Sequence, residues 1–218
     1  MAYVMEIEIN PEGVLHLVAG PNGSGKSTLV EQFYGVVPPV KFVNADNIAR
    51  EQHCCPRGTD LGRFLFQEIN DAFTAHASLI YETTLSGKFD NKLIKRARAE
   101  GYKIKITYIV LASVEQNLAR VSERVKKHNG HNVPEDDVRR RYEKSLFHFD
   151  AVCKIIDSWQ LYNNAGPQFC LVANGAGNEI NIIEPKMYQG FIEHKADVVQ
   201  RYINDFNARR ARRLNLQH

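Results

Sequence analysis

Apolar runs alternate along the chain with segments in which apolar residues recur every three or four positions. The short runs predict strands and the periodic segments predict helices. We expect strands at Val14–Ala19, 41–44, 79–81, 103–111 and 159–162, followed by a hairpin of 169–173 and 180–183. We expect helices at 28–33, 60–76, 91–100, 114–127, 135–149 and 185–213. This order is typical of an α/β fold in which a mostly parallel sheet carries helices on both faces.

Local signals support several of these boundaries. Ser113 and Gln116 form a capping-box pattern, Pro134 fits a first helical position, and Gly101 fits a helix end. The segment 174–178 has the turn chemistry that the hairpin needs. The irregular segment 126–133 suits a mobile lid, which we place at about 126–137.

The composition indicates one soluble domain over residues 1–218, with a helical extension at about 185–218. Of the 218 residues, 44% are hydrophobic, and the net charge of +3 is too small to indicate nucleic-acid binding. Residues 1–10 lack the pattern of a signal peptide, and no window is apolar for long enough to span a membrane. The cysteines lack zinc spacing, so we expect reduced thiols and a cytoplasmic location. They are Cys54, Cys55, Cys153 and Cys170.

The segment between the first strand and the first helix matches the phosphate-binding motif G-x-x-x-x-G-K-[ST]. In such a loop, backbone N–H groups surround a β-phosphate, the lysine spans the β- and γ-oxygens, and the hydroxyl can ligate Mg²⁺. The sequence therefore predicts binding of a nucleoside triphosphate, with Ser27 on the metal. The residues of this P-loop and its flank are Gly20, Pro21, Asn22, Gly23, Ser24, Gly25, Lys26, Ser27 and Thr28.

Two acidic residues follow strands whose carboxyl ends should face this loop. Asp46 could accept the proton of an attacking hydroxyl, hold Mg²⁺ through water, or cap the helix that begins at Asn47 or Ile48. Glu82, which is followed by Thr83 and Thr84, could bind substrate hydroxyls, hold a metal through water, or only contact the P-loop.

Basic residues flank the apolar faces of two predicted helices. Arg120, Arg124 and Lys127 follow one side of 114–127, beside the stripe of Val114, Leu118, Val121 and Val125. On the next helix we expect Val138, Tyr142, Ser145 and Phe149 to be buried. Arg139 and Arg141 flank that face, and Arg140 points to solvent. Phosphoryl transfer requires such cations, although each arginine could equally be a solvated surface residue.

Four segments together resemble the zeta toxin family of P-loop kinases, in particular its chromosomal branch, which is often labelled as predicted ABC-type ATPases. They are 19–28, 44–49, 82–87 and 120–142, within roughly residues 13–165. The resemblance implies an ATP-dependent kinase that phosphorylates a sugar nucleotide, which in the toxin branch is UDP-N-acetylglucosamine at its 3′-hydroxyl. An antitoxin protein becomes a candidate partner, whereas toxicity itself does not follow.

The resemblance also implies roles for individual residues. Asp46 would be the catalytic base, Lys26 and Ser27 would bind ATP and Mg²⁺, and Glu82 with its two threonines would lie on the sugar side. The candidates for phosphate contact from the lid are Arg120, Arg124, His131 and Arg141. Asn163 stands where the family commonly has an aspartate.

Two hypotheses from different classes remain. The first is a small-molecule kinase. The second is a nucleotide-switched binding protein, associated with RNA through Arg209, Arg210, Arg212 and Arg213. An ABC transporter ATPase is disfavoured because the strand after Leu85-Ser86-Gly87 lacks a terminal Asp-Glu. A GTPase is disfavoured because Asn91-Lys92-Leu93-Ile94 lacks the guanine-reading aspartate.

Overall fold

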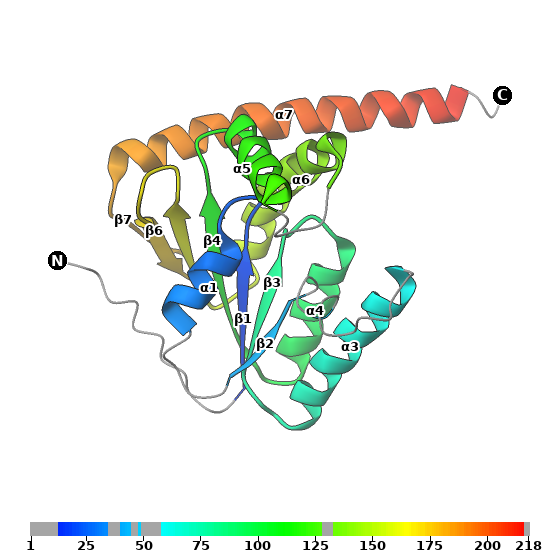
Figure 1. Cartoon of the computed structure of the whole chain (residues 1–218), viewed down its shortest axis with the longest axis vertical. Coiled ribbons are helices and arrows are strands. Elements are labelled where there is room, and N and C mark those ends of the chain that lie inside the picture. Colours follow the sequence, from blue (N-terminus) through cyan, green and yellow to red (C-terminus); the bar gives the residue numbers. More distant parts are fainter. Residues whose placement is uncertain (1–12, 35–39, 45–47, 49–57, 128–132, 216–218) are drawn as a thin grey trace.

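A seven-stranded sheet with the order β2-β3-β1-β4-β5-β6-β7 forms the centre of the protein (Figure 1). The computed structural model describes residues 13–34, 40–44, 48, 58–127 and 133–215, and the structural statements below concern these residues. The strands are β1 Val14–Ala19, β2 Lys41–Val43, β3 Leu79–Thr83, β4 Lys103–Val110, β5 Ser158–Asn163, β6 Cys170–Ala176 and β7 Glu179–Ile182. The helices are α1 Lys26–Tyr34, α3 Gly58–Thr74, α4 Lys88–Ala99, α5 Val114–Lys126, α6 Glu135–Cys153 and α7 Pro185–Asn215.

The strands β2, β3, β1, β4 and β5 are parallel, whereas β6 and β7 are antiparallel. This arrangement confirms the predicted α/β fold of the P-loop NTPase type. β1 lies between β3 and β4, with Ala19 opposite Thr83 on one side and Tyr108 on the other. The carboxyl ends of β1 and β3 therefore meet at one edge of the sheet.

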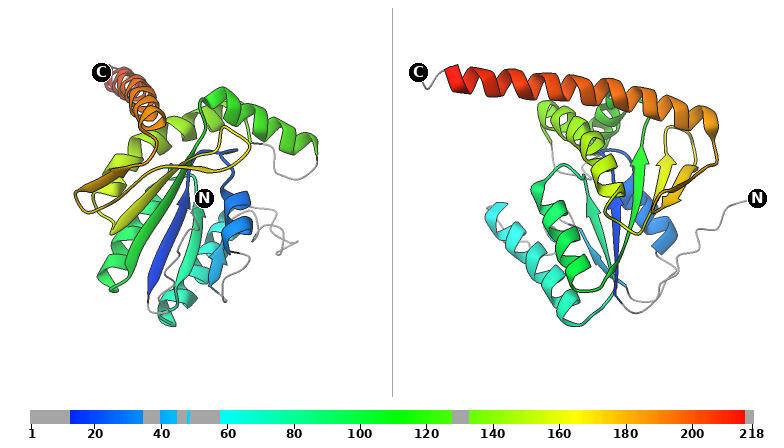
Figure 2. Two further views of the ribbon diagram at one scale, coloured as in Figure 1. Left: turned by 90° about the vertical axis from the view of Figure 1, so that its left-hand side faces the viewer. Right: turned by 180° about the vertical axis from the view of Figure 1, so that it is seen from behind.

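Helices cover the two faces of the sheet unequally. Leu15 and Leu17 of β1 belong to a large core cluster with buried side chains of α3, α4, α6 and α7. Val18 points to the opposite face, where a smaller cluster includes Leu29 and Val30 of α1. Figure 2 shows α1 and α4 on opposite sides of the strands. Because a parallel sheet is stable only when both faces are covered, α1 is the main helical support for the second face.

Several predicted boundaries need correction. α4 begins at Lys88, three residues before the predicted start, because the Asp90 side chain accepts a hydrogen bond from Gly87 N (3.2 Å). Pro134 is the N-cap of α6 and lies just outside the helix. β6 extends to Ala176, which leaves Gly177 and Asn178 as the hairpin turn.

Other local signals are confirmed. The Ser113 hydroxyl accepts a hydrogen bond from Gln116 N at 3.3 Å and caps α5. In a capping box the Gln116 side chain would accept a hydrogen bond from Ser113 N. Here the Gln116 amide oxygen accepts instead from Ala112 N, one residue earlier, at 3.2 Å. Gly101, with a φ of 81°, follows α4 as predicted.

α7 packs on α6 through its first half and then extends past the body of the protein (Figure 1). The Tyr142 hydroxyl lies 2.7 Å from His194 Nε2, and the buried Lys195 pairs with Asp150 at 2.5 Å. Arg209, Arg210 and Arg212 near the end of α7 are exposed. Within the described ranges, no helix combines the length and apolarity needed to cross a membrane.

His16 of β1 is buried, and its Nε2 lies 2.9 Å from the Thr107 hydroxyl. Burial, with a smaller contribution from the charge of Lys105, lowers the pKa of His16 to about 3. The folded protein therefore holds this imidazole neutral, whereas the unfolded chain protonates it below about pH 6.5.

We predict that His16 lowers the stability of the folded protein at acidic pH. As the pH falls from 7 to 5, proton uptake by the unfolded chain should cost about 2 kcal/mol of the free energy of unfolding. His16→Gln keeps a hydrogen-bonding side chain but cannot titrate, so its loss over the same interval should be smaller by about that amount. Urea unfolding of both proteins at the two pH values measures the difference. Equal losses in the two proteins would show that His16 is not the titrating group.

Candidate functional site

The P-loop connects the end of β1 to the start of α1 and is anchored at both ends. Gly20 N donates to Thr83 O at 3.3 Å, and Leu29 N donates to Gly25 O at 2.9 Å. Lys26 is only 7% exposed, and its Nζ donates to Gly20 O (2.9 Å) and Pro21 O (3.0 Å). The ammonium group thus lies against the loop, at the N-terminus of α1.

A pocket of about 610 Å³ opens beside this loop at the carboxyl ends of the parallel strands. Its size is within the usual range for a small-molecule site. The pocket is lined by Asn22, Gly23, Gly25, Lys26, Ser27, Thr28, Asn44, Tyr81, Glu82, Thr83, Thr84, Arg120, Arg124, Arg141, Asn164, Gly166 and Pro167. Most of the predicted site residues therefore meet in one cavity. Gly20, Pro21 and Ser24 belong to the loop but not to the lining.

Glu82 at the end of β3 lies beside the predicted metal residue. Ser27 Oγ donates to both carboxylate oxygens, at 3.0 and 3.3 Å, and the Asn44 amide donates to the same carboxylate. The predicted contact with the P-loop is therefore observed. Mg²⁺ prefers oxygen ligands and is usually bound by one or two protein groups together with phosphates and water. Ser27 and Glu82 fit that requirement.

Three arginines from two helices line the same pocket. Arg120 and Arg124 come from α5 and Arg141 from α6. Arg120 Nη2 donates to Asn164 O at 2.7 Å, which fixes its guanidinium near the loop. Such cations can hold the charge of a phosphate chain at a site that is partly removed from water.

The other predicted cations lie elsewhere. Lys127 does not join the stripe of Arg120 and Arg124, because its side chain is 66% exposed and pairs with Glu123 at 2.7 Å. Arg140 is exposed as predicted and pairs with Asp137 at 2.6 Å. Arg139 is half-buried and lies outside the pocket lining, with ion pairs to Glu135 and Glu115.

The inner faces of α5 and α6 agree with the prediction to different degrees. Val138, Tyr142, Ser145 and Phe149 of α6 are all buried, as predicted. On α5, Val121 is buried, whereas Val114, Leu118 and Val125 are only half-buried. Asn117 is the other buried residue of α5, so this helix faces the P-loop with a polar side chain that the predicted stripe omitted.

The loop after β3 is shaped by a buried carboxylate. Asp90 accepts hydrogen bonds from the Thr83 hydroxyl (2.6 Å) and Gly87 N (3.2 Å). Burial raises the pKa of Asp90, and these two bonds oppose that rise. Leu85 adopts a left-handed conformation with a φ of 55°, and His148 Nδ1 donates to its carbonyl oxygen at 3.0 Å. The Thr83 hydroxyl is thus engaged with Asp90, whereas that of Thr84 lies 2.8 Å from the Ser86 hydroxyl.

Two predicted site residues, Asp46 and His131, lie outside the described residues, as do residues 128–132 of the predicted lid. The residues that flank the segment of Asp46 are described. Asn44 is buried beside Glu82, and Ile48 N donates to Asn44 O at 3.1 Å.

No role was predicted for Asn44, Asn117 or Asn164, which all contact the site. Asn44 belongs to the segment 44–49 and Asn164 follows Asn163, and their contacts come from distant parts of the chain. Asn117 gave a usable signal, because it is a polar residue on the inner side of an amphipathic helix.

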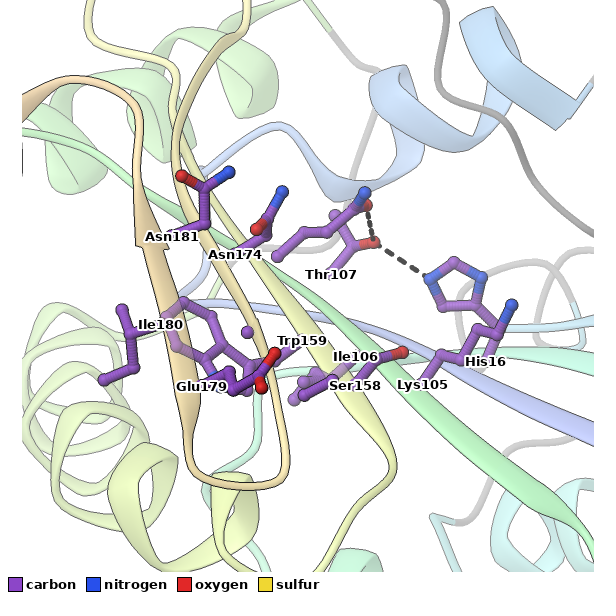
Figure 3. Close-up of a pocket in the computed structure, with 13 residues that line it drawn as sticks. His16, Lys105, Ile106, Thr107, Ser158, Trp159, Asn174, Glu179, Ile180 and Asn181 are labelled. Atoms are coloured by element: carbon purple, nitrogen blue, oxygen red, sulfur yellow. Dashed lines mark hydrogen bonds between the residues drawn. The ribbon is translucent and has the colours of Figure 1, made fainter.

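A second cavity of about 700 Å³ lies on the sheet face of α1, toward the start of β1 and β4. Figure 3 shows His16, Thr107, Asn174 and Asn181 as neighbouring polar groups in it. Its lining contains no P-loop residue and no arginine. Lys105 is the one lysine of its lining, whereas the pocket at the P-loop combines the loop with Lys26 and three arginines, so the pocket at the P-loop is the candidate site.

Comparisons with known proteins agree with this fold. A family model described as an AAA domain matches residues 15–147. A protein of Haemophilus influenzae described as uncharacterized is 36% identical over 126 residues, which cover 56% of this chain and 88% of the relative.

Solved structures extend the agreement. A chain of the AvrRxo1-ORF1:AvrRxo1-ORF2 complex with sulphate ions has a TM-score of 0.66 at 14% identity, over 83% of this chain and 63% of that chain. This chain thus spans less than two thirds of that protein, whose complex is also known with ATP. A chain of the PezAT toxin-antitoxin system of Streptococcus pneumoniae has a TM-score of 0.52 at 15% identity, over 86% and 88%. At these identities the likeness shows the fold.

We predict that the pocket arginines bind an anionic chain. Arg124→Ala and Arg141→Ala should each weaken the binding of inorganic tripolyphosphate about 10- to 100-fold, because each removes charge-assisted hydrogen bonds. Titration calorimetry measures the dissociation constants. Arg139→Ala is the matched control, because Arg139 belongs to an ion-pair group on α6 outside the pocket lining, and its affinity should stay within about twofold. Equal affinities in all three variants would contradict this assignment.

Proposed function

The chain belongs to the AAA domain family, and we propose that it is a P-loop phosphotransferase of the zeta toxin type. It transfers the γ-phosphate of ATP to a hydroxyl group of a sugar nucleotide such as UDP-N-acetylglucosamine. The observation that carries the proposal is a single pocket in which the P-loop, the Glu82 carboxylate and three arginines meet.

The distribution of the arginines favours transfer over a nucleotide switch. A phosphoryl group in transit carries negative charge on its equatorial oxygens, and catalysis consists largely of positioning it and stabilising that charge. Arg120 and Arg124 approach from α5, whereas Arg141 approaches from α6. Cations from two separate elements suit a group that must be held between a donor and an acceptor.

Lys26, Ser27 and Glu82 make up the nucleotide side of the site. Lys26 at the start of α1 would bridge the β- and γ-phosphates. The Ser27 hydroxyl and the Glu82 carboxylate, 3.0 Å apart, would hold Mg²⁺ directly or through water. When bound, this ion neutralises charge on the β- and γ-oxygens. In this assignment Glu82 serves the metal, while Thr84 and the adjacent lining are left for the acceptor.

We assign the role of general base to Asp46. Only Ala45 separates it from Asn44 in the sequence, so the covalent chain limits how far apart the two residues can lie. Asn44 in turn donates to Glu82, which contacts Ser27. A carboxylate in this vicinity could accept the proton of an alcohol that attacks the γ-phosphorus, and it is worth about 10²- to 10⁴-fold in rate.

A protein partner is part of the proposal. Two of the structural neighbours come from two-component complexes, AvrRxo1-ORF1:AvrRxo1-ORF2 and PezAT, the second of which is a toxin-antitoxin system. A small antitoxin-like protein that covers the phosphate pocket would fit the same arrangement in this chain.

The reaction is tested by incubating the protein with ATP, Mg²⁺ and a panel of UDP-sugars, nucleosides and short RNAs. Mass spectrometry should find one UDP-sugar heavier by a single phosphate, with ADP formed in equal amount. ADP formation that is slow and independent of every acceptor would instead support the nucleotide switch.

We predict that three variants separate binding from transfer. Lys26→Ala should lose measurable ATP binding, because it removes the cation at the phosphates. Asp46→Asn should bind ATP as the wild type does but transfer phosphate at least about 100-fold more slowly. Calorimetry and the mass assay measure the two properties.

The control for these variants is Arg140→Ala, which removes an exposed α6 arginine outside the pocket and should leave both properties unchanged. Full transfer activity in Asp46→Asn would exclude this residue as the base.

A further inference from the structure

Two asparagines hold the P-loop from its outer side. Asn117 Nδ2 of α5 donates to Asn22 O at 2.7 Å. Asn164 Nδ2, just after β5, donates to Ser24 O at 2.9 Å. The two accepting carbonyls belong to alternate residues of the same loop, and the two donors come from different elements of the fold.

These bonds control where the following N–H groups point. In a trans peptide the C=O and N–H groups lie on opposite sides of the chain. When the Asn22 carbonyl is held by Asn117, the N–H of Gly23 is turned the other way, and the Ser24 carbonyl fixes the N–H of Gly25 in the same manner. Gly23 and Gly25 both line the pocket. Their N–H groups are of the kind that a P-loop uses to surround a β-phosphate.

The packing at these two positions leaves little freedom. Gly23 and Gly25 have φ angles of 78° and 99°, which other residues rarely adopt. A Cβ at Gly23 would lie 2.6 Å from Asn117 O, and a Cβ at Gly25 would overlap the Asn164 amide. The two asparagines therefore pack so closely against Gly23 and Gly25 that a side chain at either glycine would clash with them.

The burial of Asn117 indicates that the hydrogen bond from its Nδ2 to Asn22 O does more than stabilise the fold. The residue is 0% exposed, and within the described part of the chain its Oδ1 accepts no hydrogen bond. A buried carbonyl without a partner costs about 1–3 kcal/mol, which offsets the gain from the single bond that the amide donates. An apolar residue of similar size would remove the unpaired oxygen but would also leave Asn22 O without this donor, so the two effects on folding oppose each other.

Asn164 has a second link to the site. Its backbone oxygen accepts the 2.7 Å hydrogen bond from Arg120, while its side chain holds Ser24 O. One residue thus fixes a phosphate-facing arginine and a phosphate-facing peptide relative to each other.

We propose that Asn117 and Asn164 are positioning residues that orient the Gly23 and Gly25 peptides toward the β-phosphate of a bound nucleotide. This inference rests on the proposed nucleotide binding but not on the identity of the acceptor, nor on transfer taking place.

The test compares ADP with AMP, which lacks the β-phosphate, in titration calorimetry with Mg²⁺. For Asn117→Leu and Asn164→Asp, the preference for ADP over AMP should fall about tenfold, while the affinity for AMP changes by less than about threefold. Asn163→Asp is the matched control for added charge. Asn163 is adjacent, but its Oδ1 accepts from Ala165 N (2.8 Å), a contact that an aspartate preserves. Its ADP preference should stay at the wild-type value.

Thermal unfolding separates positioning from a structural role. Asn117→Leu should melt close to the wild-type temperature while its ADP preference falls, because the unpaired Oδ1 that it removes offsets the bond that Asn22 O loses. The proposal is overturned if both variants keep the wild-type preference, if ADP and AMP lose affinity equally, or if the wild type binds ADP no more tightly than AMP. A wild type that prefers ADP but phosphorylates no acceptor would refute the proposed function and leave this inference standing.

Discussion

The pairing of β1 between two parallel neighbours determines where the P-loop and Glu82 meet. With Ala19 level with Thr83 and Tyr108, the loop that follows β1 starts at the height at which β3 presents Glu82. The Ser27–Glu82 contact follows from that alignment. Because side chains alternate between the faces of a strand, a shift of one residue in the β1–β3 register would turn Glu82 to the opposite face. The candidate metal site is therefore set by the hydrogen bonding of the sheet.

The arginines of the pocket rest on helices whose other sides are fixed in the core. Arg141 is followed by the buried Tyr142, which is bonded to His194 of α7. One turn further along α6, Ser145 is 2.7 Å from the Tyr108 hydroxyl. Sites on packed helices are held more precisely than sites on loops. Arg141 is thus positioned by the same contacts that join α6 to the sheet and to α7.

Much of this arrangement could be predicted because it depends on short-range patterns. The P-loop motif fixes its own local structure, and helical spacing was enough to place Arg120, Arg124 and Arg141 on one side and Arg140 on the other. Lys127 was misplaced because it lies at the end of α5, where pairing with Glu123 competes with the extrapolated stripe.

The contacts that were not predicted join residues far apart in the chain. The hydrogen bond from Asn164 to Ser24 spans 140 residues, and that from Asn117 to Asn22 spans 95. Only the assembled fold brings such partners together, so no local pattern could reveal them. For Asp46 and His131 the sequence remains the sole source of the assignments.

In the segment between β3 and α4, the residues that hold the shape of the chain differ from Thr84 and Ser86, whose hydroxyl groups contact each other. Its shape is held from inside the protein by Asp90, the Thr83 hydroxyl and the left-handed Leu85, which is itself buried. Thr84 and Ser86 are half-buried and make their hydroxyl contact with each other. Replacement of these two side chains during evolution would leave the internal anchors intact. Related proteins could therefore differ in the groups that contact these two hydroxyls while they keep the same P-loop.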